Sequence, residues 1–211
     1  MSSNLVYLKT SFTMKRILLL TFIIFSCHTL AIAQVMEDDF ESNQYNWSEL
    51  SSSRGKALIR DGVLHLESSS KFVLSTCYAP FDVNKPFVLT VEALAKKIDN
   101  RNLFGILLDY EDEQNYILFY ISDDEAKLEI LRENKLVGYK EESLKLRKGK
   151  KVGIDFEVEY NLNELIFKVN GVRAMAYRRR ISKDDFLLGT SGIGFYARKG
   201  SIDFDNLKII Q

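Results

Sequence analysis

The stretch Leu165-Ile-Phe-Lys-Val-Asn-Gly-Val-Arg-Ala-Met-Ala-Tyr177 decides the fold of this chain. At its centre, the pair Asn170-Gly171 favours positive φ at both central positions of a type I′ turn, whose twist matches that of the two strands it joins. In the run before the turn, Leu165, Phe167 and Val169 occupy every second position, so they would lie on one face of a strand. The chain therefore turns back on itself here as an antiparallel hairpin.

The same pattern recurs along most of the sequence, and Asp61-Gly62 is a second hairpin turn of this kind. The runs that we expect to form strands are 56–60, 63–67, 72–78, 87–95, 103–110, 115–121, 127–132, 136–140, 152–160, 164–170, 192–197 and 201–210. Only 141–146 and 182–188 could hold one or two turns of helix. Short strands at regular spacing, with turn signals between them, predict an all-β sandwich or barrel.

The domain organisation follows from the absence of a break in this pattern. The chain has 211 residues, and its length allows one domain or two. Only two prolines occur and no Pro/Ser-rich linker interrupts the strands, so we expect a single β domain over 34–211. Both ends of this domain, 38–40 and 202–209, have strand-like sequences. Terminal strands in sandwiches often lie close together, and we expect the same here.

The first 33 residues have the pattern of a secretory signal peptide. Met14-Lys15-Arg16 is a positive start, an apolar run follows over 17–25, and Ala31-Ile32-Ala33 is a small-x-small cleavage signal. The pattern is compatible with a start at Met14, and its removal leaves no membrane span. A bacterial lipoprotein signal, with Cys27 lipidated, is the alternative. We expect a secreted, periplasmic or cell-surface protein of a bacterium.

The basic residues of the N-terminal segment offset the net negative charge of the rest of the chain. The whole chain has a formal net charge of zero, but residues 34–211 hold 26 basic and 29 acidic residues, a net charge of −3. Nucleic-acid binders usually have a basic surplus on one face, so we expect no nucleic-acid partner.

The order of several short motifs resembles a known superfamily. These motifs are Asp38-Asp39-Phe40, Trp47, Asp61-Gly62-Val63-Leu64-His65-Leu66, Phe104-Gly105-Ile106, Asn115-Tyr116-Ile117, Val169-Asn170-Gly171, Gly192-Ile193-Gly194-Phe195-Tyr196 and Phe204-Asp205-Asn206-Leu207. Their order resembles the concanavalin A-like lectin/glucanase superfamily, and more closely the bacterial secreted laminin-G-like or putative sugar-hydrolase domains of unknown function. The resemblance covers nearly all of 38–211, and its motifs are architectural rather than catalytic. It implies a two-sheet antiparallel β-sandwich of the jelly-roll type, in which ligands are often bound on the concave face.

Catalytic carboxylates in the family 16 glucanases of this superfamily follow an E-x-D-x-x-E strand motif, which the sequence lacks. The nearest arrangement is Asp155-Phe-Glu157-Val-Glu159, in which three carboxylates share one strand face. If the protein were an enzyme, Asp155, Glu157 and Glu159 would be its catalytic candidates. The alternative is a solvent-facing polar row on a half-buried strand, without catalysis.

Aromatic side chains are the candidates for a sugar site, because a flat ring stacks on the apolar face of a pyranose and can also offer a hydroxyl or N–H group. Tyr116 and Tyr120 alternate with Ile117 and Phe119 on one strand, and we expect the Ile/Phe face to be the core. The tyrosine side is then either an open binding face or covered by a loop. Trp47, the only tryptophan, is either a ligand contact or an anchor in the core.

Acidic residues at the two ends of the domain could hold a calcium ion, as related folds often do. Asp38 or Asp39 would meet Asp203 or Asp205 if the terminal strands adjoin, and Asp39 and Asp205 are the candidates that we retain. The alternative is that these acids cap turns at the surface. We expect no other cofactor.

Cysteine usage gives little sign of chemistry. Cleavage of the signal removes Cys27, so Cys77 would be the only cysteine left and no disulfide within the chain could form. Cys77 lies in a strand pattern, which favours a buried thiol that behaves as a small hydrophobe. A nucleophilic role would need a histidine, and His65 is the only one in 34–211.

These observations predict a secreted carbohydrate-binding or adhesion-type β-sandwich module without catalytic activity. The alternatives are a structural or protein-interaction domain of the cell envelope, and a glycoside hydrolase. We expect a monomer whose partner is a glycan or an envelope protein.

Overall fold

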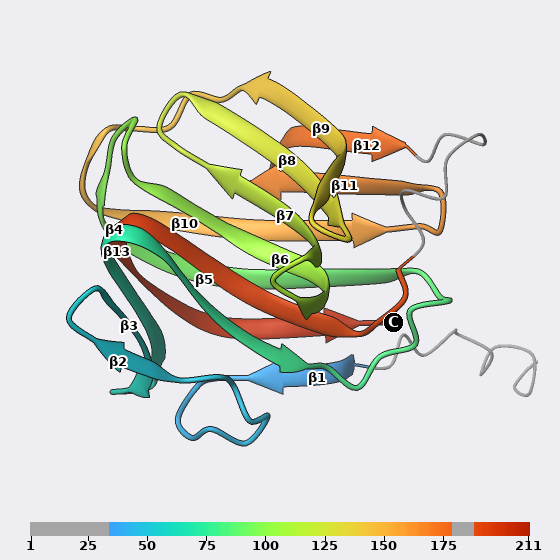
Figure 1. Cartoon of the computed structure of the whole chain (residues 1–211), viewed down its shortest axis with the longest axis horizontal. Coiled ribbons are helices and arrows are strands. Elements are labelled where there is room, and N and C mark those ends of the chain that lie inside the picture. Colours follow the sequence, from blue (N-terminus) through green and yellow to red (C-terminus); the bar gives the residue numbers. More distant parts are fainter. Residues whose placement is uncertain (1–33, 179–187) are drawn as a thin grey trace, which may run out of the picture. The chain divides into compact units, whose positions relative to one another are not determined.

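The structure is a computed structural model and describes residues 34–178 and 188–211 (Figure 1). The signal peptide predicted over 1–33 and most of the 182–188 segment lie outside the described residues and stay predictions. The strands of the described part are β1 (Gln34–Asp38), β2 (Leu50–Ser52), β3 (Gly55–Arg60), β4 (Val63–Tyr78), β5 (Phe87–Ile98), β6 (Leu103–Asp112), β7 (Asn115–Ile121), β8 (Glu125–Arg132), β9 (Lys135–Ser143), β10 (Gly149–Tyr160), β11 (Glu164–Val169), β12 (Val172–Arg178) and β13 (Gly192–Ile210).

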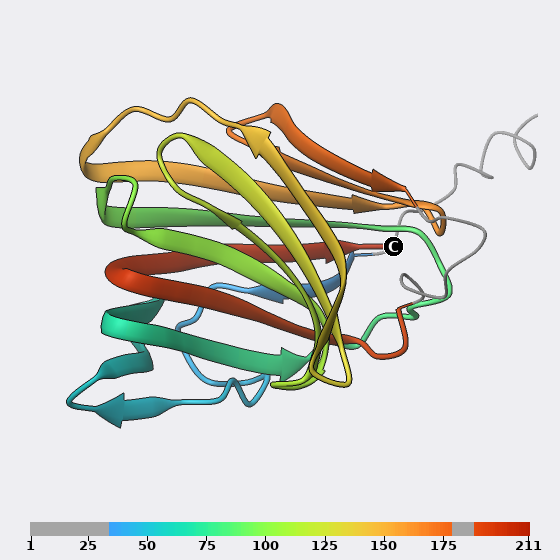
Figure 2. The same ribbon diagram turned by 45° about the horizontal axis from the view of Figure 1, so that its top comes forward.

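The last strand, β13, belongs to two layers. Its first half, 192–198, pairs with β6 on one side and with the end of β4 on the other. Its second half, 202–210, pairs with β5 on one side, and with the start of β4 and then β1 on the other. Layer A therefore has the order β9-β8-β7-β6-β13-β4, and layer B has the order β12-β11-β10-β5-β13 followed by β4, β3 and β2. Figures 1 and 2 show β6 to β9 as one layer over β5, β10 and β11.

Aromatic rings from the two layers meet directly in the core. Phe119 of β7 stacks on Phe167 of β11 with ring centroids 4.4 Å apart. Phe195 and Phe204, from the two halves of β13, stack at 4.2 Å. All four rings are buried. The alternating apolar residues thus face the inside of a two-sheet antiparallel β-sandwich, which confirms the predicted all-β fold class.

Both predicted hairpin turns have the expected backbone geometry. φ is 52° at Asn170 and 73° at Gly171, and it is 54° at Asp61 and 71° at Gly62. Across these turns β11 pairs with β12, and β3 pairs with β4. Leu165, Phe167 and Val169 of β11 are buried, as their alternation in the sequence predicts.

Two strands are longer than the sequence suggests. β4 and β13 each run without interruption where we expected two separate strands. The pairing register of β13 shifts just before Gly200, where the strand crosses from one layer to the other. A Cβ at Gly200 would lie 2.7 Å from the ring of Phe104, so a larger residue would push against the core at this crossing. The polar residues around Gly200, whose composition is typical of a loop, therefore form a bulged bend within β13.

The helical turns expected over 141–146 are not formed. Residues 141–143 extend β9. The N–H groups of Leu144 and Leu146 donate to the carbonyls of Asp124 and Asp123 in the turn between β7 and β8. Backbone hydrogen bonds to a neighbouring turn therefore replace the bonds that a helix would make within itself.

The two ends of the domain adjoin, as expected. β1 pairs antiparallel with the end of β13, and Asp38 lies opposite Leu207. Among residues 34–178 and 188–211, no helix is long and apolar enough to cross a membrane.

Candidate functional site

The outer face of layer A carries an apolar cluster that is separate from the core. On β7, every second residue points away from the core, and these residues are Tyr116, Leu118 and Tyr120. Leu107 of β6 and Tyr196 of β13 pack beside them. We call these five residues the tyrosine face. Neighbouring side chains bury three of them, whereas Tyr116 and Tyr120 are half-buried and remain accessible to solvent.

Three rings form a row across the strands of this layer. The centroid of Tyr196 lies 5.9 Å from that of Tyr120 and 6.2 Å from that of Phe72 on β4. Gly105 of β6 lies between Tyr196 and Tyr120 in the pairing register. A Cβ at Gly105 would lie 2.8 Å from both Cα and Cβ of Tyr120, so a larger residue here would displace the residue that carries one of these rings. Phe72 is 51% exposed, so the row ends at an accessible ring.

A depression of about 240 Å³ lies beside this row, and we call it the Phe72 groove. Its lining residues are Phe72, Leu74, Leu107, Glu113, Tyr116, Leu118, Leu131, Asn134 and Tyr196. Most of these side chains are apolar or aromatic, and Glu113 and Asn134 add hydrogen-bonding groups. A concave, ring-lined surface with a few polar groups is the usual form of a small-molecule site.

Hydrogen bonding and burial fix the tyrosines of this face before any ligand binds. The hydroxyl of Tyr120 donates to Oε1 of Glu129 at 2.7 Å. Burial and then this hydrogen bond hold the pKa of Tyr120 well above its ordinary value, and burial raises the pKa of Tyr196 to about 12. Both hydroxyls therefore stay protonated at neutral pH. A ring that is already ordered loses less entropy when a ligand stacks on it.

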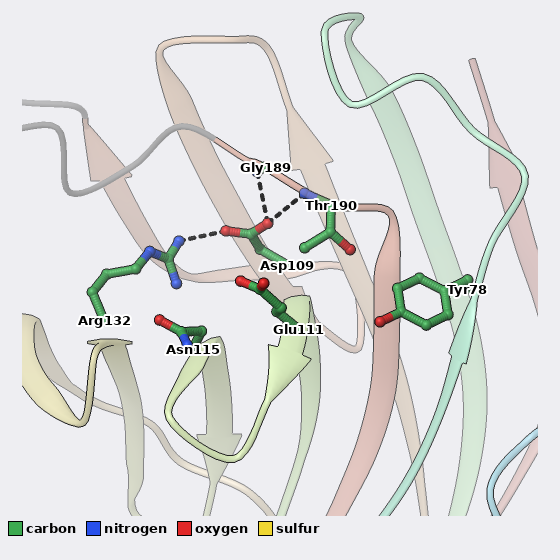
Figure 3. Close-up of a pocket in the computed structure, with 7 residues that line it drawn as sticks. All are labelled: Tyr78, Asp109, Glu111, Asn115, Arg132, Gly189 and Thr190. Carbon is green, nitrogen blue, oxygen red and sulfur yellow. Dashed lines mark hydrogen bonds and ion pairs between the residues drawn. The ribbon is translucent and has the colours of Figure 1, made fainter.

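A second, more polar pocket of about 360 Å³ lies at one end of layer A (Figure 3). Its lining residues are Tyr78, Asp109, Glu111, Asn115, Arg132, Gly189 and Thr190, and we call it the Asp109 pocket. Here β4, β6 and β8 end and β7 begins, and the chain approaches β13. Tyr78 and Phe72 occupy alternate positions of the same regular part of β4, so they lie on the same side of layer A.

Asp109 organises this pocket from a buried position. Its Oδ1 accepts the backbone N–H groups of Gly189 at 2.7 Å and of Thr190 at 2.9 Å, and its Oδ2 accepts an N–H of the Arg132 guanidinium. Figure 3 shows the carboxylate between these two sets of donors. Burial raises the pKa of Asp109, and the backbone donors and Arg132 oppose that rise. The side chain therefore holds the start of β13 and the Arg132 guanidinium in fixed positions.

The carboxylates considered for catalysis lie on layer B. Asp155, Glu157 and Glu159 share the outer face of β10, as the alternation predicts. Nζ of Lys168, on β11, lies 2.7 Å from Oε1 of Glu157 and also bonds Glu159. The hydrogen bond from Lys168 is the main cause that lowers the pKa of Glu159. Asp155 and Glu157 also line a polar depression of about 400 Å³ on this face.

Trp47 lies in the core, 2% exposed. Its ring stacks on Phe195 with centroids 5.2 Å apart, and its Nε1 donates to Oδ2 of Asp38 at 2.8 Å. Oδ1 of Asp38 accepts the N–H of Phe40. Trp47 is therefore the anchor of the N-terminal loop in the core, and the prediction that it contacts a ligand is wrong.

The acids at the two ends of the domain have local partners. Asp39 accepts the N–H of Glu41, and Asp205 accepts the N–H of Asn206. These contacts correspond to the turn-capping alternative. Across 34–178 and 188–211, no group of three or more His, Cys, Asp or Glu side chains is placed to hold a metal ion.

Cys77 and His65 lie on the same strand in different surroundings. Cys77 is a buried free thiol, and burial, helped by the nearby carboxylate of Asp38, raises its pKa to about 12. His65 is also buried, and its Nδ1 is hydrogen-bonded with Oδ1 of Asp203. A protonated thiol is a poor nucleophile, so Cys77 fits the role of a small core residue.

Sequence reasoning missed the Asp109 pocket. Its residues come from five separate segments and share no motif. One signal was present, because Asp109 follows the apolar run 103–108 inside a predicted strand. An acidic residue in a buried run needs a partner, but the pattern does not say that the partner is Arg132.

Comparisons with known proteins support the fold. No protein-family model matches the chain, and no curated protein matches it in sequence. A Bacillus subtilis protein of unknown function with a galectin-like fold has a TM-score of 0.60 and 12% identity, over 85% of this chain and 96% of that one. The carbohydrate-binding module CBM66 from Bacillus subtilis has a TM-score of 0.55 and 12% identity, over 82% and 99%.

A third solved structure is SCLam, a non-specific endo-β-1,3(4)-glucanase from family GH16. It has a TM-score of 0.59 and 11% identity, over 85% of this chain and 91% of that one. At such low identity these similarities concern the fold alone. They show that the chain has the fold of a galectin-like, jelly-roll β-sandwich.

Proposed function

We propose that the chain is a carbohydrate-binding β-sandwich module that holds a glycan on the tyrosine face and in the Phe72 groove. The main support is the row of rings formed by Phe72, Tyr196 and Tyr120, in which Phe72 is exposed, Tyr120 is half-buried and the buried Tyr196 joins the two. Aromatic faces pack against the C–H faces of sugar rings, and adjacent polar groups bind the hydroxyls. Glu113, Asn134 and the Tyr120–Glu129 pair are the polar groups at hand.

The solved structures of the same fold favour the same ligand class. One is a carbohydrate-binding module and another is a glucanase, and both act on carbohydrate by their descriptions. A shared fold is a weak argument for shared function, so the proposal depends on the rings and uses the fold only as support.

We propose that the module is non-catalytic. A retaining or inverting glycosidase needs one carboxyl group that is protonated near neutral pH. Lys168 holds Glu159 in the ionised form, and the row of Asp155, Glu157 and Glu159 lies in the other layer from the rings. The buried Asp109 carboxylate lies in the layer of the rings, but both of its oxygens already accept hydrogen bonds from the fold. A panel of polysaccharides incubated with the purified protein should yield no reducing ends, and turnover that is lost in Glu157→Gln would contradict this part.

Export and partners complete the proposal. The segment 1–33 would direct the chain out of the cytoplasm, and the remaining chain would act as a secreted, periplasmic or surface-attached monomer. Its partner would be a glycan. N-terminal sequencing of the protein recovered outside the cytoplasm should begin at Gln34, whereas a lipid-modified Cys27 at the terminus would favour the lipoprotein alternative.

Affinity electrophoresis tests the binding site. Native gels would contain β-1,3-glucan, β-1,4-glucan, mannan, galactan or mucin, and the wild-type protein should be retarded in at least one. Phe72→Ala and Tyr116→Ala should each weaken binding about tenfold, since each removes a ring that stacks on sugar. Leu94→Ala is the matched control, because Leu94 is 45% exposed on β5 of layer B. No retardation in any gel, or equal retardation of all variants, would contradict the proposed function.

A further inference from the structure

The Asp109 pocket contains polar groups that the fold does not use. Among the described residues, the carboxylate of Glu111 and the hydroxyl of Tyr78 have no hydrogen-bond partner, and the Tyr78 side chain is 66% exposed. Arg132 gives one N–H to Asp109 and one to the carbonyl of Leu131, which leaves further guanidinium N–H groups free. An acceptor, a set of donors and an exposed ring therefore border one cavity, as Figure 3 shows.

The charges of the pocket select against anions. Asp109 already neutralises Arg132 through a close ion pair, and Glu111 adds a further negative charge. An incoming carboxylate or sulfate would face Glu111, and among the described residues that line the pocket no cation other than the paired Arg132 is present to bind it. Hydroxyl groups suit the site better, because a vicinal pair can donate to Glu111 and accept from Arg132 at the same time.

The pocket adjoins the Phe72 groove on the same side of layer A. Leu74 lines the groove and Tyr78 lines the pocket, and both occupy outward positions on β4. Four residues of a strand span about 13 Å. The two cavities approach each other more closely elsewhere, because Tyr116 and Leu131 of the groove are chain neighbours of Asn115 and Arg132 of the pocket. A short oligosaccharide can therefore occupy both.

We propose that the Asp109 pocket is a second carbohydrate subsite, which binds one uncharged sugar unit of the same glycan chain that lies on the tyrosine face. This inference rests on the proposed function. Glu111 and Arg132 bind vicinal hydroxyls, the ring of Tyr78 covers the apolar side of the sugar, and Asp109 is a positioning residue that holds Arg132. The preferred ligand is therefore a neutral oligosaccharide rather than a uronic-acid or sulfated chain.

Isothermal titration with oligosaccharides of increasing length tests the subsite. The probes are fragments, from disaccharide to hexasaccharide, of whichever neutral polymer retards the protein in the gels. Wild-type affinity should rise about tenfold once the fragment is long enough to reach the pocket. Glu111→Gln and Tyr78→Ala should lose that gain and bind the disaccharide as the wild type does. Glu133→Gln is the matched control, since Glu133 is an exposed acid in the adjacent β8–β9 turn outside the pocket.

The outcomes separate the two proposals. If Tyr116→Ala weakens binding at all lengths while Glu111→Gln and Tyr78→Ala bind every length like the wild type, the second subsite is wrong and the proposed function stands. If polygalacturonate or heparin binds more tightly than every neutral polymer, the argued selectivity is wrong. If the wild type binds none of these probes, both proposals fail.

Discussion

At the scale of single residues, the tyrosine face depends on a position that has no side chain. A Cβ at Gly105 would lie 2.1 Å from the carbonyl oxygen of Phe119 and 2.8 Å from Cα of Tyr120. These are backbone atoms, which cannot turn aside as a flexible side chain can. We expect Gly105→Ala to lower the free energy of unfolding by about 3 kcal/mol, the upper end for overpacked sites, as measured by urea denaturation.

Gly153 provides the control for this substitution. It lies in a strand as Gly105 does, on β10, but a Cβ there would meet no atom within 4 Å. Gly153→Ala should leave the free energy of unfolding unchanged or raise it by about 0.5 kcal/mol, because alanine restricts the unfolded chain. Equal losses in the two variants would mean that crowding at Gly105 is not the cause.

The thiol of Cys77 should be inert in the folded protein. Its pKa is about 12 in the fold, against 9.0 for the unperturbed group, so the thiolate is negligible at pH 8. A disulfide reagent at pH 8 should modify Cys77 only after denaturant is added. Fast modification without denaturant would show that the strand opens readily.

The same pKa shift predicts a dependence of stability on pH. Because the folded pKa lies above the unfolded one, Cys77 contributes stability in full below pH 9, and this contribution falls as the pH rises toward 12. Cys77→Ala should lack this part of the alkaline destabilisation. The measurement is the denaturation midpoint of both proteins between pH 8 and pH 11, and parallel pH profiles would contradict the assignment.

At the scale of elements, local patterns predicted most strands because strands such as β5, β8 and β11 bury every second residue on one face. The alternation of β7 and β11 gave the correct inner face, and the dipeptides Asn170-Gly171 and Asp61-Gly62 gave the turns. The bends of β4 and β13 escaped prediction, since bulged residues are polar and exposed like those of a loop.

The candidate site was predictable only in part, for a related reason. Tyr116 and Tyr120 share a strand, so the alternation alone placed them on one outer face. The contacts of Tyr120 with Tyr196, and of Asp109 with Arg132, join residues far apart in the chain. Such pairs depend on strand order, which alternation does not determine.

The β11–β12 hairpin offers a test of turn chemistry. Gly171 has φ of 73° with no atom near its absent Cβ, so Gly171→Ala would introduce backbone strain without a clash. We expect a loss of about 1 kcal/mol in the free energy of unfolding. Gly149→Ala, at the start of β10, is the control, because a Cβ there would meet only Val152 at 3.8 Å. A loss in the control as large as in Gly171→Ala would contradict the turn argument.

At the scale of the whole molecule, β13 joins the two layers into one cooperative unit. Its halves pair with β4 and β6 in one layer and with β1, β4 and β5 in the other. Phe195 and Phe204 then stack between the layers. No set of strands within layer A or layer B has a complete core of its own, so the described part of the chain should unfold in one step.

Phe204→Ala tests this cooperativity. The ring is fully buried and lies between the layers, so its loss should lower the free energy of unfolding by about 3–5 kcal/mol. Trp47, the only tryptophan, stacks on Phe195 and reports the core by fluorescence, while far-ultraviolet circular dichroism reports all strands. The two denaturation curves should coincide in both proteins, and separate midpoints would mean that the layers unfold independently.

The double role of β13 also has a consequence for how the protein is made. A ribosome synthesises β4 and β6 long before residues 192–210, and until then neither strand has the neighbour that completes its sheet. If 1–33 directs export as proposed, the nascent polypeptide would remain extended for most of translation. An extended chain can pass through a secretion pore, so folding would be completed only after export from the cytoplasm.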